Sequence, residues 1–192
     1  MKLLKIALLI VVVAVATQGQ TAKMGMGAFS SESGDILMAV DASLVNRIVD
    51  SPYVMFVGYF GAKDTNKALT IEAKDVVMVY KGQEYAMPSV KELRNNYEGG
   101  QRDIQFYTRL GKEGVGASWV RIYEFPNSTN FFPPNAPGAE LAVDAGHMAG
   151  YLGFLTPLYF KNPGLAKGDT LVIKVRDKKN PELVGECEVT LD

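Results

Sequence analysis

The sequence is poor in the residues that hold metals and form cross-links, with one cysteine, Cys187, and one histidine, His147, among 192 residues. One cysteine cannot make an internal disulfide, so the hydrophobic core must stabilise the fold. One histidine cannot build a His-rich zinc site, and the spacing of His147 and Cys187 matches no zinc motif. We therefore expect no metal and no cofactor.

Motifs for nucleotide binding and for serine hydrolysis are also missing. No glycine belongs to a G-x-x-x-x-G-K-[ST] loop or to a G-x-G-x-x-G turn after a strand, and no serine lies in a G-x-S-x-G elbow. Charge of one sign is not in excess, because 20 basic residues face 21 acidic ones and neither sign forms a long run. Nucleic acid is therefore an unsuitable partner, since phosphate binding needs a basic face.

The one long apolar run lies at the N-terminus, where Ile6–Ala16 follows Lys2 and Lys5 and ends in small residues. This order is typical of a secretory signal peptide. A helical membrane span needs about 20 apolar residues, and this run is much shorter. We predict a signal peptide at 1–16, with cleavage as late as residue 22. The mature chain would be periplasmic or extracellular and would have no membrane span.

Residues 17–34 are rich in Gly, Ser and Thr and show no periodicity, which predicts a flexible segment. Residues 35–192 fit one domain, whose size allows a substantial core. Short runs with strand-like patterns are separated by Gly, Pro and Asn turns. The predicted strands are 36–40, 53–60, 69–73, 76–80, 84–87, 118–125, 151–160, 170–176 and 184–191.

The pattern changes to a helical one after Pro88. Ser89 with Glu92 three residues later forms a capping box, and Val90, Leu93 and Tyr97 recur at helical spacing. Glycines 99 and 100 would end this helix, and a second helix is predicted from 102 to 110. Together they make a two-helix insertion between strands.

The last strands show the clearest alternation of apolar and polar residues. Cys187, Val189 and Leu191 would face the core, while the residues between them face solvent. The stretch 163–191, with Lys-Gly-Asp before alternating residues 171–175, resembles the closing strands of bacterial immunoglobulin-like domains. Many short strands and this resemblance predict an antiparallel β-sandwich, immunoglobulin-like, with the short two-helix insertion.

His147 and Cys187 are the two residues with the chemistry of a base or a nucleophile. His147 follows Asp144 in a predicted loop, where an exposed histidine without partners is the simpler interpretation than a catalytic base. Cys187 lies on the apolar face of the last strand, where a thiol serves as packing. We predict no catalytic residue, although a carboxylate pair among the 21 acidic residues stays an alternative.

A loop of 24 residues, 126–149, carries four prolines and the pair Phe131-Phe132. Loops this long are functional or mobile in compact domains. We predict that Phe131 and Phe132 are the anchors of a binding surface, because aromatic side chains contribute large contact areas. The alternative is that the loop folds back and buries both rings as a lid on the core.

These observations favour a secreted or periplasmic, non-catalytic binding or interaction module of the cell envelope or exterior. Its partner would be a protein or an envelope polymer. Two other classes stay open: a hydrolase acting on an extracellular polymer, and a structural subunit that assembles through a sheet edge or its N-terminal segment.

Overall fold

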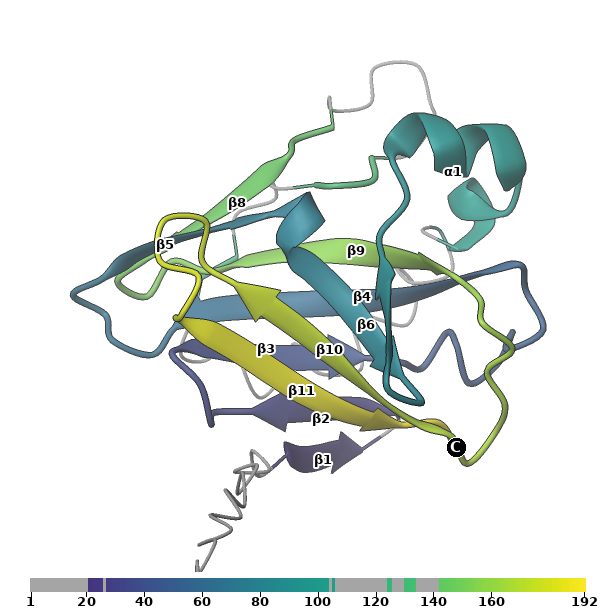
Figure 1. The fold of residues 1–192 in the computed structure, drawn as a ribbon, viewed down its shortest axis with the longest axis horizontal. Helices are drawn as coiled ribbons and strands as arrows, with labels where there is room; N and C mark the ends of the chain where they lie inside the picture. The colour runs from purple at the N-terminus through teal and green to yellow at the C-terminus, as the bar shows by residue number, and fades with distance from the viewer. Residues whose placement is uncertain (1–20, 26, 104, 106–123, 126–129, 134–141) are drawn as a thin grey trace, which may run out of the picture.

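The computed structural model describes residues 21–25, 27–103, 105, 124–125, 130–133 and 142–192. Two antiparallel sheets form its body (Figure 1). The larger sheet has the order β1 (Thr21–Gly25), β2 (Ala28–Ser31), β3 (Ile36–Asp41), β4 (Tyr53–Ala62) and β9 (Phe154–Lys161). The smaller sheet has the order β11 (Val184–Thr190), β10 (Thr170–Arg176), β6 (Val76–Tyr80) and β7 (Gln83–Ala86). A separate ribbon pairs β5 (Ala68–Glu72) with β8 (Ala145–Ala149), and the 3₁₀ turn η1 (Ala73–Asp75) leads from β5 into β6.

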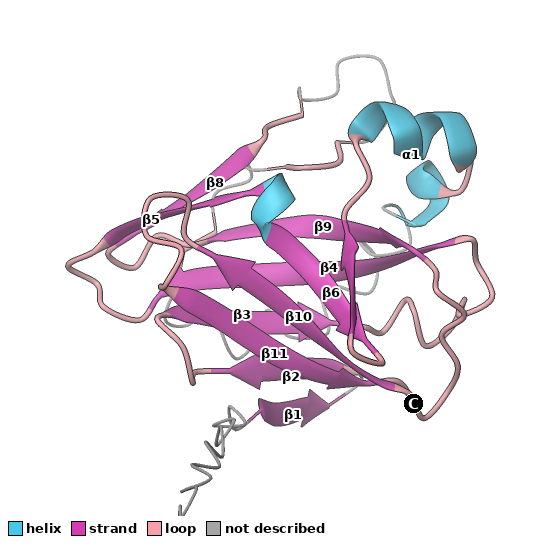
Figure 2. Cartoon of the chain, viewed as in Figure 1, coloured by secondary structure: helices cyan, strands magenta, loops and turns pink. Residues whose placement is uncertain are grey.

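This architecture confirms the predicted β-sandwich with a short helical insertion. The insertion consists of α1 (Val90–Asn96) and the helical residues 100–103, and it enters the chain between β7 and β8 (Figure 2). Strands β6 and β10 have the predicted bounds. Four consecutive strands, β1 to β4, form a meander, so the immunoglobulin-like description holds for the two-sheet architecture and not for the strand order.

Strand β4 lies inside the larger sheet, next to the edge strand β9, and all ten of its residues are buried. It pairs with β3 on one side and β9 on the other, which places Phe60 opposite both Met38 and Phe154. A Cβ added to Gly185 of β11 would lie 2.9 Å from the Met38 sulfur, so this set of side chains faces the smaller sheet. The sheet's other face carries Met55, Tyr59 and their neighbours, because side chains alternate along a strand.

The C-terminal hairpin confirms the predicted alternation. Ile173 of β10 pairs with Cys187 of β11, and Leu171 pairs with Val189. These four side chains are 0 or 1% exposed. The alternating pattern was readable in sequence because these strands are covered on one face only.

The expectation of a flexible segment at 17–34 is corrected for its described part, which forms β1 and β2. Ala28 and Phe29 are buried in the core, and Lys23 lies 2.6 Å from a carboxylate oxygen of Asp192. Gly27, with a φ of 82°, lies in the turn between the two strands. Strands β1 and β2 are five and four residues long, too short for a readable period. β1 is stabilised by pairing with β2, and β2 by pairing with β3.

The loop predicted at 126–149 is also corrected at its end, because Ala145–Ala149 is strand β8, paired with β5. The predicted strand 118–125 lies mostly outside the described residues. Within it, Glu124 bridges to Leu152, and Phe125 packs edge-on against Tyr59 with the ring centroids 5.5 Å apart.

Candidate functional site

Helix α1 begins at the capping residue that the sequence predicts. The Ser89 hydroxyl accepts a hydrogen bond from the Glu92 backbone N–H at 3.1 Å, which satisfies one of the free donors of the first turn. Leu93 is buried, and Tyr97 ends the helix in an extended conformation. The chain then turns through Gly99 into the helical residues 100–103, so both pieces of helix lie close to Tyr97.

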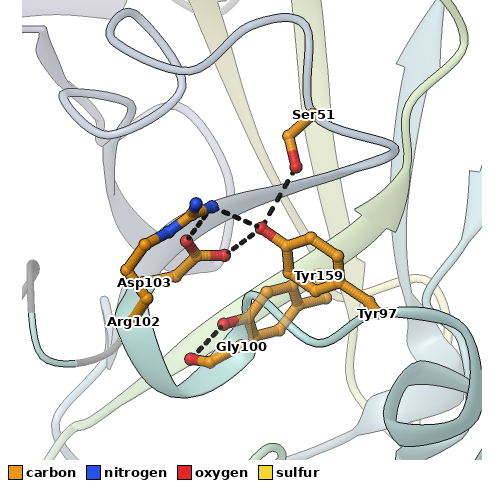
Figure 3. Close-up of polar contacts among 6 residues, drawn as sticks. All are labelled: Ser51, Tyr97, Gly100, Arg102, Asp103 and Tyr159. Atoms are coloured by element: carbon orange, nitrogen blue, oxygen red, sulfur yellow. Dashed lines mark hydrogen bonds and ion pairs between the residues drawn. The ribbon is translucent and has the colours of Figure 1, made fainter.

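A polar cluster joins these two pieces to the end of the loop before β4 (Figure 3). The Tyr97 hydroxyl donates to the Asp103 Oδ2 at 2.6 Å and accepts from the Ser51 hydroxyl at 3.1 Å. Arg102 donates to the same tyrosine oxygen and to Asp103 Oδ1, both at 3.3 Å. Tyr97 is therefore held by three neighbours, each of which limits the movement of its ring.

Asp103 is the most deeply buried acid of this cluster, with no exposed surface. Burial raises the pKa of the Asp103 carboxyl, although the hydrogen bonds from Tyr97 and Arg102 act in the opposite direction. Burial and the neighbouring Asp103 also raise the pKa of Tyr97. Both groups keep their protons more readily than in water, and both are partnered.

Tyr159 forms the base of the site from β9. Its register partner is Met55, so its ring lies on the face of the larger sheet that points away from the smaller sheet. The hydroxyl donates to the Gly100 carbonyl at 3.2 Å, and burial raises the pKa of the phenol. Phe132 packs edge-on against Tyr159 at 5.2 Å, and Tyr97 packs against it from the other side at 6.3 Å.

Above these rings lies a pocket of about 210 Å³. Its floor is aromatic and apolar, and its rim carries the exposed side chains of Arg94, Glu98 and Gln101. The Arg94 guanidinium donates to the Pro133 carbonyl at 3.4 Å, which places the charge at the edge of the pocket. The described residues that line it are Val90, Leu93, Arg94, Tyr97, Glu98, Gly100, Gln101, Phe132, Pro133 and Tyr159. We call this the α1 pocket.

A second and more open hollow of about 650 Å³ is also lined by Tyr97. Tyr97 and Glu98 line both spaces, so the two are neighbours. The other described residues that line the second hollow are Arg47, Ile48, Asp50, Ser51, Pro52, Asn96, Gly99 and Arg102. We call it the outer hollow.

Phe131 and Phe132 are 2% and 4% exposed, so the structure corrects the hypothesis that they are exposed anchors. They lie on opposite sides of β9. Phe131 contacts Phe154 on the face toward the smaller sheet, and its backbone N–H donates to the Thr156 hydroxyl at 2.9 Å. Phe132 covers Tyr159 on the other face and lines the α1 pocket. The lid alternative describes these two rings, while residues 126–129 and 134–141 lie outside the described part.

The surroundings of His147 and of Cys187 are not those of a catalytic dyad. His147 is exposed on β8, where its Nδ1 lies 3.0 Å from the Thr70 hydroxyl. Cys187 is fully buried as predicted, and burial raises the pKa of its thiol to about 12. Within the described ranges, no group of three or more His, Cys, Asp or Glu side chains could hold a metal ion.

The sequence interpretation missed the polar residues of the site. The sequence places Tyr97 on one helical face with Val90 and Leu93, but no pattern distinguishes the polar residues Arg94, Glu98, Gln101 and Asp103. Polar residues around a helix end can form the rim of a pocket, but the same residues are typical of an ordinary solvated helix surface. Their sequence therefore does not distinguish the two cases. Burial of Asp103 was the informative signal, and only tertiary structure shows it.

Comparison of the chain with protein-family models, with curated proteins and with solved structures found no significant match. In the described portion of the chain, no helix has the length and apolar character needed to span a membrane. The case for function therefore depends on the geometry of the site.

Proposed function

We propose that this protein is an exported, non-catalytic binding module, and that the α1 pocket is its ligand site. The observation that carries the proposal is the pocket itself: an apolar floor of three aromatic residues, Tyr97, Phe132 and Tyr159, under a rim of exposed polar side chains. Concave sites that combine an apolar lining with a few convergent polar groups are the usual form of small-molecule sites.

The size of the pocket indicates what it can hold. Pockets for drug-sized ligands measure about 300–1,000 Å³, so a space of about 210 Å³ suits a single ring or a short side group. Such a group could belong to a larger molecule that continues outside.

The rigidity of the walls supports binding as the role of this pocket. Tyr97 is fixed by Ser51, Arg102 and Asp103, and Tyr159 is fixed by Gly100. Side chains that are already ordered lose little conformational entropy when a ligand arrives. The polar cluster therefore has a role beyond stability, since it keeps the pocket open in one shape.

Export is supported by the sequence at residues 1–16, where a short basic region precedes an apolar run that ends in alanine. A core without disulfides is compatible with this location, because the buried aromatic residues of β4 and β9 supply the stability. The proposed module would act on molecules of the cell envelope or the exterior.

The test of the pocket uses ring-sized probes and three tryptophan variants. Phenol, indole, methyl α-glucoside and N-acetylglucosamine are titrated into the purified protein and followed by NMR of the side chains. We expect saturable binding of at least one probe. Val90→Trp and Gln101→Trp place a large ring in the pocket and should abolish it, whereas Lys91→Trp makes the same change on α1 outside the pocket and should not. Binding that survives both pocket variants, or no binding of any probe, would overturn the proposal.

A further inference from the structure

The α1 pocket and the outer hollow are neighbours, because Tyr97 and Glu98 line both. The α1 pocket has room for one ring, and the outer hollow is larger. Its lining includes the polar side chains of Arg47, Asp50, Ser51, Asn96 and Arg102. A ligand that enters both spaces would extend past Tyr97 and would meet polar side chains along its length. We propose that the ligand is a neutral oligosaccharide of two or more sugar rings that crosses Tyr97, and this inference rests on the proposed function.

The charges around the two spaces favour a neutral ligand. Arg102 is already paired with the buried Asp103, so its charge is compensated within the protein. The lining also contains two other basic residues, Arg47 and Arg94, and two acidic residues, Asp50 and Glu98, so the two signs of charge are equal in number. A polyanion or a polycation would meet repulsion from one half of this set, whereas an uncharged ligand would meet none.

The small exposed area of the aromatic floor favours a polar ligand over an apolar one. Tyr159, Phe132 and Tyr97 are 1%, 4% and 9% exposed, so a ligand can touch only a small part of each ring. An apolar anchor of a protein partner needs a large desolvated contact to bind tightly. A sugar ring needs less contact with the aromatic rings, because its hydroxyls bind the side chains of the rim.

The helical residues of the site offer side chains rather than backbone groups for hydrogen bonding. The backbone of the helical pieces is internally bonded, as the bonds from Leu93 N–H to Ser89 and from Asp103 N–H to Gly99 show. An extended peptide is recognised through backbone groups at a free strand edge, which these helices do not supply. Hydroxyl groups both donate and accept, and they match the guanidinium, carboxylate and amide groups of Arg94, Glu98 and Gln101.

The experiment measures affinity against ligand length by calorimetry. The probes are neutral gluco-, chito- and manno-oligosaccharides of one to six units, with a polygalacturonate fragment and an unstructured peptide of mixed sequence for comparison. We expect at least one neutral series to bind, with affinity rising by about tenfold or more from one unit to three, since the second space adds new hydrogen bonds. If the affinity does not change with the number of sugar units, the inference that the ligand crosses Tyr97 is wrong.

Variants separate the two halves of the site. Arg94→Ala and Gln101→Ala should weaken the single sugar and the trisaccharide alike. Asp50→Asn and Asn96→Ala should weaken the trisaccharide by about tenfold and leave the single sugar unchanged, because one lost hydrogen bond costs about that much. Lys91→Ala, on the same helix but outside both spaces, is the matched control and should change neither.

The outcomes distinguish this inference from the proposed function. If indole or phenol occupies the α1 pocket but no sugar series binds, the pocket is a binding site and the oligosaccharide inference is wrong. If the peptide or the acidic fragment binds more tightly than every neutral series, the inference is also wrong. If nothing enters the pocket, both fail. Cleavage of a bound oligosaccharide would instead support the hydrolase alternative and contradict the non-catalytic assignment.

Discussion

Removing the Phe131 ring should destabilise the protein strongly while leaving the α1 pocket in place. Phe131 is 2% exposed, contacts Phe154 with the centroids 6.0 Å apart, and donates its N–H to Thr156. Truncating a buried phenylalanine costs about 3–5 kcal/mol. For a chain of this size that corresponds to a fall of roughly 6–20 °C in melting temperature. Phe131→Ala therefore tests whether the segment 130–133 is part of the core.

The assay is thermal and urea unfolding followed by circular dichroism, with Leu152→Ala as a control. Leu152 is 49% exposed, so its truncation should cost less than about 1 kcal/mol. Phe132→Ala should also lower stability, and it should weaken ring-probe binding because Phe132 lines the α1 pocket. If Phe131→Ala melts with the wild type, the ring does not lie between the sheets. The prediction of an exposed aromatic anchor would then return.

Three further predictions concern Asp103, Cys187 and the N-terminus of the exported protein. Asp103→Ala leaves the Tyr97 hydroxyl without its buried acceptor and should cost about 1–3 kcal/mol in urea unfolding, whereas Asp103→Asn keeps an acceptor and should cost less. Because the Asp103 pKa is raised in the folded state, its stabilising contribution is present at low pH and is lost as pH rises. Asp103→Asn should therefore gain stability relative to the wild type as the pH rises above about 4, and an opposite trend would contradict the burial argument. The Cys187 thiol, with its pKa raised to about 12, should resist alkylation at neutral pH until the protein unfolds, and rapid labelling of the native protein would refute its burial. Intact mass of the exported protein should place its N-terminus between Thr17 and Ala22, and retention of residues 1–16 would contradict the signal peptide.

The buried carboxyl group of Asp103 links the stability of the site to its proposed role in binding. Asp103 is buried at some energetic cost, and what it stabilises is the position of Tyr97 between the α1 pocket and the outer hollow. Buried polar groups are costly unless they are partnered, and this one has two partners. Losses in Asp103 variants should therefore appear both in unfolding and in ligand affinity.

The sequence alone determined the sandwich and the start of the helical insertion. Periodicity is a local property, so β10 and β11, which bury alternate residues, could be read from their residues, as could the cap of α1 at Ser89. The core position of Cys187 followed from the same alternation. Strands β1 and β2 were missed because such short strands depend on their neighbours: β1 pairs with β2, and β2 pairs with β3.

Tertiary structure alone decided the location of the site and the role of the two phenylalanines. In sequence, Phe131 and Phe132 look alike, but in the structure their rings lie on opposite faces of the sheet beside the edge strand β9. One ring then fills the space between the sheets, and the other lines a pocket. Ser51, Tyr97 and Asp103 come together for the same reason, because packing of the helical insertion on the larger sheet brings a loop and two helix ends to one point.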